Sequence, residues 1–133
     1  MVSGLLRAGL VAFILAAAGH QAAADSSCAS LAALTIPNVK VARATGVAAG
    51  PFAPPGSSKP LILPAFCRVE AVATPAPDSV INFEVWMPAA AAWTGRFQGV
   101  GNGGYSGAIG YGAMAEALNR GSAVTSTDIG HSG

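Results

Sequence analysis

Two segments with alternating apolar side chains constrain the fold of this chain more than any other feature. In residues 67–73 and again in residues 81–87, every second side chain is apolar, and Pro75-Ala76-Pro77-Asp78 lies between the two segments. Alternation with a period of two is typical of half-buried strands, and the proline-rich tetrapeptide predicts a turn. The pattern therefore predicts a β-hairpin. Its apolar side must be buried, so the hairpin belongs to a larger sheet.

A strand, a glycine-rich loop, a helix and a second strand are predicted after the hairpin. Residues 97–100 predict a short strand, and Gly101-Asn102-Gly103-Gly104 follows at once. Apolar residues recur at helical spacing from Tyr111 to Leu118, and Gly121 is placed to end that helix. Residues 122–127 predict the second strand. This order predicts a βαβ unit with parallel strands, and the fold class is therefore α/β.

The region before the hairpin has weaker patterns. Residues 28–34 predict a helix or turn, which Pro37 ends, and residues 39–41 predict a short strand. Residues 49–64 contain five prolines and two glycines, which predicts a loop over the surface.

The first 24 residues have the features of a secretory signal peptide. Arg7 gives a positive start, residues 8–18 are apolar, and Ala22-Ala23-Ala24 suits a signal peptidase. The apolar run is too short for a comfortable membrane anchor. We therefore expect residues 1–24 to be a signal peptide and residues 25–133 to be the mature domain, secreted or periplasmic and with no membrane attachment after cleavage.

Export also bears on the cysteines. Cys28 and Cys67 are the only two in the chain, and an oxidising compartment favours a disulfide between them.

Composition excludes two broad classes of protein. Hydrophobic residues make up 52% of the chain and charged residues 10%, which is the opposite of a disordered composition. The net charge is +1 and the basic residues are dispersed singly, so we expect no nucleic-acid partner.

The glycine loop allows three interpretations. It can be a tight turn without further function. Residues 99–104 also match the G-x-G-x-x-G pattern of dinucleotide-binding βαβ units, with Asp128 near the end of the next strand, but six residues separate these glycines from the predicted helix. The third interpretation is an oxyanion loop, because α/β-hydrolases place a glycine-rich loop with a catalytic backbone N–H after their third strand.

Several segments together resemble one enzyme family. They are Ile36-Pro37-Asn38, residues 63–69, residues 81–88, residues 93–97, residues 99–105 and Ser126-Thr127-Asp128-Ile129-Gly130-His131. The glycine loop and the final hexapeptide are specific in combination. In these segments the chain resembles the N-terminal part of the tannase/feruloyl esterase family of secreted serine hydrolases.

The resemblance implies an incomplete α/β-hydrolase-type sheet, made of the N-terminal hairpin and one βαβ unit. It implies a carboxylic-ester hydrolase whose substrates are small esters of aromatic acids such as gallate or ferulate. Asn102, Gly103 and Gly104 would supply N–H groups of the oxyanion hole, and Cys28 and Cys67 match a structural disulfide of the family. The resemblance implies no cofactor and no metal in this segment, and a structural calcium in the lid of the longer proteins.

The catalytic triad of the family has no counterpart in this chain. Neither cysteine precedes a Ser-x-Gly-Gly sequence, and no G-x-S-x-G occurs, so the nucleophile elbow and the lid are missing. We therefore expect an N-terminal fragment without esterase activity of its own. A local triad of Ser106, Asp128 and His131 is an alternative, but a structural role for Asp128 and His131 beside the site is favoured. A small exported binding or structural module is the alternative from another class.

Overall fold

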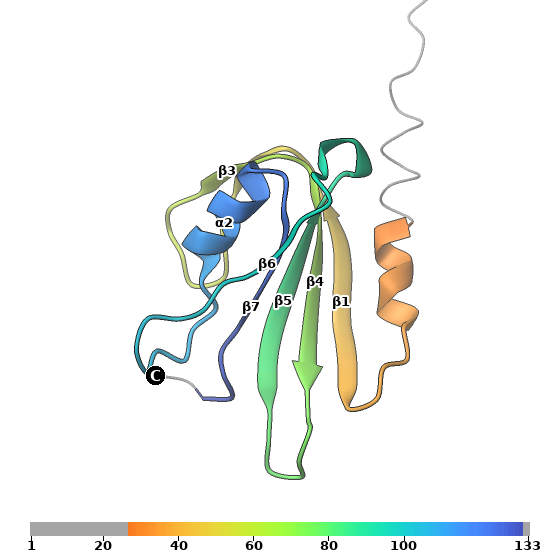
Figure 1. Ribbon diagram of the computed structural model, residues 1–133, viewed down its shortest axis with the longest axis vertical. Helices are drawn as coiled ribbons and strands as arrows, with labels where there is room; N and C mark the ends of the chain where they lie inside the picture. Colours follow the sequence, from red (N-terminus) through yellow and green to blue (C-terminus); the bar gives the residue numbers. More distant parts are fainter. Residues whose placement is uncertain (1–26, 132–133) are drawn as a thin grey trace, which may run out of the picture.

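The predicted hairpin lies at the centre of a five-stranded sheet. The computed structural model describes residues 27–131; the predicted signal peptide, residues 1–24, lies outside the described residues. Strands β4 (Phe66–Ala73) and β5 (Ile81–Pro88) pair antiparallel. The sheet has the strand order β1-β4-β5-β7-β6 (Figure 1). The hairpin prediction is confirmed.

The predicted βαβ unit forms the other half of this sheet. Strand β6 (Phe97–Gly99) and strand β7 (Ala123–Thr127) pair in parallel, and helix α2 (Tyr111–Asn119) connects them. Strand β7 also pairs antiparallel with β5, which joins the unit to the hairpin. Gly121 ends the helix region with a φ of 78°, a conformation that glycine adopts without strain.

The first strand is longer than predicted. Strand β1 (Val39–Val47) pairs antiparallel with β4 along its length, with an irregular register between Val41 and Arg43. Only residues 39–41 alternate clearly enough to predict a strand. The remainder is extended because β4 offers a free row of backbone donors and acceptors, a tertiary contact that the local pattern does not encode.

The predicted surface loop at residues 49–64 is wrong in part. Strands β2 (Gly50–Phe52) and β3 (Leu61–Leu63) form a separate antiparallel ribbon. Leu63 is 3% exposed, and the Phe52 ring lies edge-on to Trp86 with centroids 5.5 Å apart. Three-residue strands are too short to show a period in the sequence, so only the packing reveals them.

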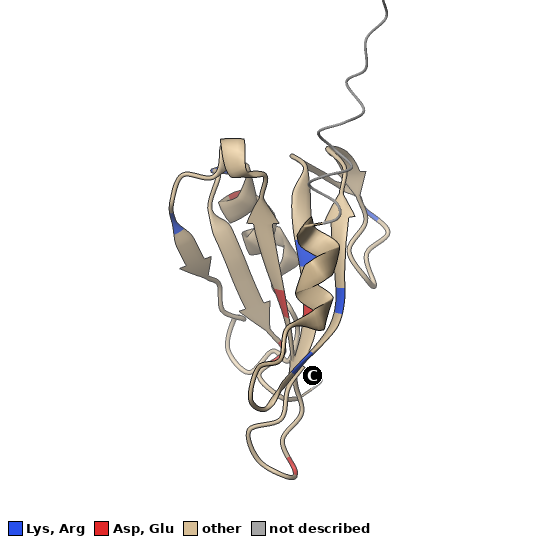
Figure 2. Ribbon diagram, turned by 90° about the vertical axis from the view of Figure 1, so that its right-hand side faces the viewer, with Lys and Arg blue, Asp and Glu red and all other residues tan. Residues whose placement is uncertain are grey.

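Helix α2 and the β2–β3 ribbon contribute to the main hydrophobic core with one face of the sheet. Its largest fully buried apolar side chains are Trp86, Met114, Leu118 and Val124. The helix contacts β7, β5 and β3. Lysine, arginine, aspartate and glutamate occupy only a few short segments of the backbone (Figure 2).

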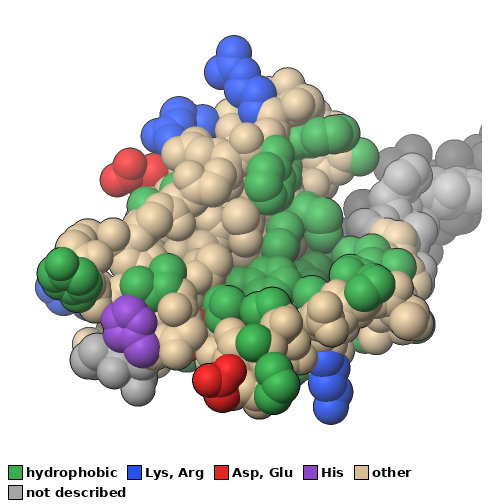
Figure 3. All heavy atoms as spheres, turned by 60° about the horizontal axis from the view of Figure 1, so that its bottom comes forward, with side chains coloured by type: hydrophobic (Ala, Val, Ile, Leu, Met, Phe, Trp, Pro, Cys, Tyr) green, Lys and Arg blue, Asp and Glu red, His purple; other side chains and the backbone are tan. Residues whose placement is uncertain are grey.

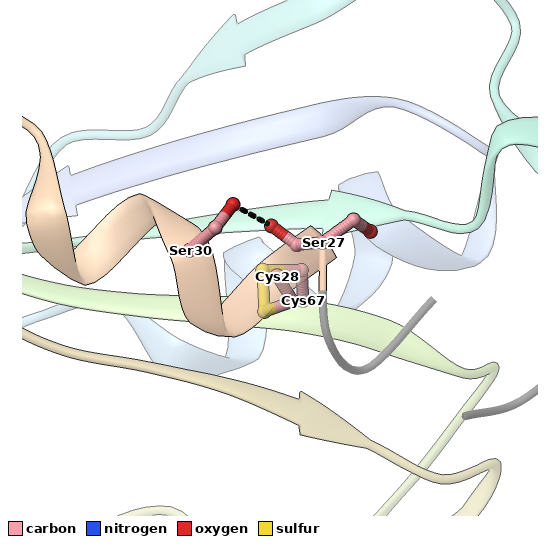
Figure 4. Close-up of a disulfide and its surroundings, with 4 residues drawn as sticks. All are labelled: Ser27, Cys28, Ser30 and Cys67. Carbon is pink, nitrogen blue, oxygen red and sulfur yellow. Dashed lines mark hydrogen bonds between the residues drawn. A yellow bond between two sulfur atoms is a disulfide. The ribbon is translucent and has the colours of Figure 1, made fainter. Parts of the chain in front are cut away.

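The opposite face of the sheet is only partly covered. Residues 27–30 are helical and lead into η1 (Leu31–Ala33), which contacts β1. The Cys28–Cys67 disulfide joins this segment to β4, which confirms the predicted pairing (Figure 4).

The rest of that face remains apolar and accessible. Successive side chains of a strand point to opposite faces, so Phe83, Val85 and Met87 of β5 point away from α2. Two cavities of about 630 and 260 Å³ both border Met87, Pro88 and Ala90. A hollow surrounded by hydrophobic side chains is visible in Figure 3.

Candidate functional site

The glycine loop joins β6 to α2, and its two ends are held on the same strand. At its start, the Val100 N–H donates to the carbonyl oxygen of Thr125 at 2.9 Å. At its end, the Gly110 N–H donates to the hydroxyl oxygen of Ser126 at 3.0 Å. Both acceptors belong to β7, so the two ends of the loop lie close together, as in a compact Ω-loop. The loop is therefore positioned by the sheet and not by the helix alone.

Five consecutive N–H groups of this loop, from Gly101 to Tyr105, have no acceptor within the described part of the chain, and three of them belong to the predicted oxyanion residues. Among residues 27–131, no hydrogen bond uses the backbone N–H of Asn102, Gly103 or Gly104 as its donor. The loop is shaped by other groups: the Asn102 side-chain amide donates to the Ser106 carbonyl at 2.6 Å, and Gly104 has a φ of 59°. These three N–H groups are consequently available to an external acceptor. Neither of the two apolar cavities includes a residue of this loop.

Asp128 fixes the turn that follows β7. One of its carboxylate oxygens accepts the N–H groups of Asn82 and Gly130, each at 2.9 Å, and the other accepts the Asn82 side-chain amide at 2.6 Å. Partial burial raises the pKa of the carboxyl, but these hydrogen bonds outweigh it, and the net pKa of Asp128 is lowered. The carboxylate thus ties the end of β7 to the start of β5.

The turn at Asp128 brings His131 against the glycine loop. The Nε2 atom of His131 lies 2.9 Å from the carbonyl oxygen of Tyr105. A carbonyl can only accept, so Nε2 is the donor and carries the proton. The structure therefore brings together the two motifs that the sequence singled out, although they are distant along the chain.

The local triad considered in the sequence analysis is not assembled. The Asp128 carboxylate bonds Asn82 and Gly130, and His131 bonds Tyr105. Within residues 27–131, no hydrogen bond joins the His131 side chain to Ser106 or to the Asp128 side chain.

The described part of the chain contains no group of three or more His, Cys, Asp or Glu residues arranged to hold a metal ion.

A buried ionic cluster behind the loop escaped the sequence analysis. Glu84 on β5 is 3% exposed and accepts hydrogen bonds from Arg68, Trp86 and Tyr111. Burial raises the pKa of this carboxyl, but the bonds from Arg68 and the other two donors prevail and lower it. The sequence does place Glu84 and Arg68 in strands that are otherwise largely apolar. Taken separately, each charged residue fits the solvent-facing side of an alternating strand, so the pattern does not reveal that the two are paired.

The same cluster shifts its other members in the expected directions. The hydrogen bond to Glu84 raises the pKa of Arg68, and burial together with the Glu84 bond raises the pKa of the Tyr111 phenol. Arg68 also lies over the Phe52 ring, 5.5 Å from its centroid. Glu84 and Arg68 are thus held charged, and Tyr111 is held as a neutral donor.

Comparison with known proteins identifies the family. A family model described as tannase and feruloyl esterase matches residues 67–133, which include the hairpin, the glycine loop and the segment with Asp128 and His131. The chain belongs to the tannase and feruloyl esterase family. This confirms the resemblance seen in the sequence.

Individual relatives agree with the family. The chain is 44% identical over 110 residues to an uncharacterized esterase of Xanthomonas campestris pv. campestris, covering 83% of this chain and 19% of the relative. It is 40% identical over 78 residues to feruloyl esterase C of Talaromyces stipitatus, covering 59% of this chain and 14% of that protein.

A solved structure shows the same fold. The crystal structure of feruloyl esterase B from Aspergillus oryzae superposes with a TM-score of 0.73 and 34% identity, covering 82% of this chain and 22% of that one. The α/β class and the partial α/β-hydrolase-type sheet are thus confirmed. The chain spans about a fifth, or less, of the length of the relatives it matches. None of the helices formed by residues 27–131 has the length and apolar character needed to span a membrane.

Proposed function

We propose that the chain is the N-terminal part of a longer, exported carboxylic-ester hydrolase that cleaves small esters of aromatic acids, and that its glycine loop supplies half of the oxyanion hole. The single observation that carries the proposal is the free backbone N–H groups of Asn102, Gly103 and Gly104, on the loop that joins β6 to α2. Membership of an esterase family supports it.

The chemistry asked of the loop is the stabilisation of negative charge. In a serine esterase, the nucleophilic hydroxyl adds to the ester carbonyl, and the carbonyl oxygen becomes an oxyanion before the alcohol leaves. Backbone N–H groups aimed at that oxygen lower the barrier, and one such donor is typically worth about 10²–10³ in kcat. This step needs donors and no cofactor. We propose that the nucleophilic serine, its histidine and its acid come from polypeptide other than these 133 residues.

Asp128 and His131 fit a supporting role in this proposal. Asp128 fixes the turn after β7, and His131 on that turn holds the Tyr105 carbonyl of the loop. A loop held at its base and along its length loses little freedom when a substrate carbonyl arrives, which is the physical basis of preorganised catalysis. The Cys28–Cys67 disulfide and the apolar start of the chain support export to the periplasm or the exterior.

The dinucleotide alternative receives no support from the geometry. A pyrophosphate site requires the glycines to open the helix, because the ligand lies at the helix N-terminus. Helix α2 begins at Tyr111, beyond the residues 99–104 that match the pattern.

The test compares two proteins: the 133-residue chain and the product of its complete open reading frame. We expect the complete product to hydrolyse methyl ferulate or methyl gallate, and the chain alone to hydrolyse neither. Within the complete product, Gly103→Pro removes the N–H, whereas Gly103→Ala keeps it, and a Cβ at Gly103 meets no atom within 4 Å.

The proline variant is expected to lower kcat by about 10²–10³, and the alanine variant to change it little. Equal losses in the two variants would show that the N–H itself is not used. Hydrolysis by the chain alone, abolished by Ser106→Ala, would replace the proposal with a local active site.

A further inference from the structure

A buried carboxylate lies behind the glycine loop and takes no part in the chemistry proposed above. Glu84 has only 3% of its surface exposed, at the middle of the central strand β5. A buried charge is costly unless it is paired and its lone pairs are satisfied. Here Arg68 Nε donates to one oxygen at 2.8 Å, while Arg68 Nη2 donates to the other. The ion pair alone would therefore suffice to neutralise the carboxylate.

Two further donors complete the site, and one of them comes from the end of the loop. The Trp86 indole N–H donates to one Glu84 oxygen at 2.8 Å, and the Tyr111 hydroxyl donates to the other at 2.7 Å. Tyr111 is the first residue of α2 and directly follows Gly110, the last residue of the loop. Each carboxylate oxygen thus accepts two hydrogen bonds.

The end of the loop is consequently attached to the sheet at two neighbouring points. The Gly110 N–H is bonded to Ser126 on β7, and the Tyr111 hydroxyl is bonded to Glu84 on β5. Packing alone does not require that hydroxyl, because the Tyr111 ring stacks on Trp86 with centroids 5.9 Å apart and an interplanar angle of 22°. A phenylalanine would fill the same space. The hydroxyl adds a directional link between the carboxylate and the backbone where the loop becomes helix.

We propose that Glu84 is a positioning residue for the oxyanion loop, acting through the Tyr111 hydroxyl; this rests on the proposed function of the loop. The carboxylate determines where α2 begins relative to the sheet. Because the other end of the loop is held by the pairing of Val100 with β7, the start of α2 sets the path of the residues between them. The direction of the N–H groups at Asn102, Gly103 and Gly104 follows from that path.

The test uses Tyr111→Phe with Thr125→Val as the matched control. Each variant removes one hydroxyl that donates to Glu84: the Tyr111 hydroxyl binds the carboxylate, whereas the Thr125 hydroxyl binds the backbone carbonyl of Glu84 at 2.9 Å. The bond from the Val100 N–H at the start of the loop goes to the backbone carbonyl of Thr125, which Thr125→Val retains. The readout is amide hydrogen exchange and ¹⁵N–¹H chemical shifts of the disulfide-bonded chain. It does not depend on enzymatic activity.

We expect Tyr111→Phe to increase exchange at the Met114 N–H, which donates to the Gly110 carbonyl at the start of α2, by about tenfold or more. The amide signals of Gly103 and Gly104 should shift in this variant and stay in place in Thr125→Val. If the two variants change the loop signals equally, or if Tyr111→Phe leaves them unchanged, the proposal is wrong.

A second variant addresses the carboxylate itself. Glu84→Gln keeps the shape of the side chain but turns one acceptor into a donor that faces another donor, so it should disturb the loop signals more than Tyr111→Phe does. In the complete gene product, Tyr111→Phe should lower kcat for methyl ferulate with KM little changed, and Thr125→Val should not. If the wild-type protein hydrolyses no ester, the proposed function fails, while the exchange experiment still decides whether Glu84 positions the loop.

Discussion

Removal of the Cys28–Cys67 disulfide should destabilise the chain by an amount that can be worked out from its position. The two cysteines are 39 residues apart and connect the N-terminal helical segment to β4. Closing a loop of that length restricts the unfolded chain, and the loop-entropy relation gives about 4 kcal/mol at 25 °C. Single domains typically have 5–15 kcal/mol of stability, so the cross-link provides a large part of the total.

The assay is urea unfolding of the oxidised chain at low protein concentration, followed by tryptophan fluorescence, in which the fully buried Trp86 reports unfolding and the 54% exposed Trp93 adds a background. With a denaturant slope of about 1–2 kcal/mol per molar urea, the double variant Cys28→Ser/Cys67→Ser should unfold about 2–4 M earlier than the wild type. Wild-type protein reduced with a thiol is the control, because it keeps both sulfur atoms and loses only the bond.

Two results would refute this reasoning. A reduced wild-type protein that unfolds within about 0.5 M of the oxidised form would mean that the unfolded chain gains little freedom when the bond is cut. A double variant that is far less stable than the reduced wild type would mean that the buried Cys28 sulfur acts through packing, since this residue is only 4% exposed.

Three further predictions concern other parts of the fold. Gly121→Ala should lower the free energy of unfolding, measured with urea, by about 2 kcal/mol or more, because a Cβ would lie 2.6 Å from the Ala92 carbonyl oxygen and φ is +78°. The control Gly112→Ala, in open space within α2, should stabilise the chain by about 0.5–1 kcal/mol. Equal effects of the two substitutions would contradict the strain argument. Because the folded-state pKa of Glu84 is lowered, the stability that this carboxylate contributes should be complete above its ordinary pKa and should disappear as the pH falls through the lowered value. In Glu84→Gln, the urea midpoint should therefore fall less at acid pH than it does in the wild type. If the midpoints of both proteins fall equally with pH, the assignment is wrong. The chain alone should bind the dye ANS on its uncovered sheet face, and Phe97→Ser, which removes a 64% exposed ring, should reduce the fluorescence; unchanged fluorescence would place the dye elsewhere.

The apolar sheet face distinguishes the two classes of interpretation for this chain. A complete small module should cover its sheet and unfold cooperatively as a monomer. The chain instead leaves the Met87 side of β5 bordering two apolar cavities. This agrees with a chain that spans about a fifth of the length of its relatives.

The elements that were predicted correctly have strong local signals. The hairpin strands alternate over residues 67–73 and 81–87, and α2 has a repeating apolar stripe closed by Gly121. The weakly patterned segments were misjudged. The end of β1 at Val47 and the short strands β2 and β3 exist because a neighbouring strand accepts their hydrogen bonds, and that neighbour is remote in sequence or across a loop.

Some features of the candidate site were likewise predictable from the sequence, and others were not. The residue types of the glycine loop and the partnership of two cysteines could be inferred from the order of residues alone, because glycine content and cysteine count are read directly from the sequence. The contact of His131 with Tyr105 and the four hydrogen bonds on the buried Glu84 carboxylate could not. These contacts depend on which strands become neighbours and on which side chains share a face of the sheet, and only the tertiary structure determines both. A charged residue in a strand can face solvent or a buried partner, and the local sequence does not distinguish the two.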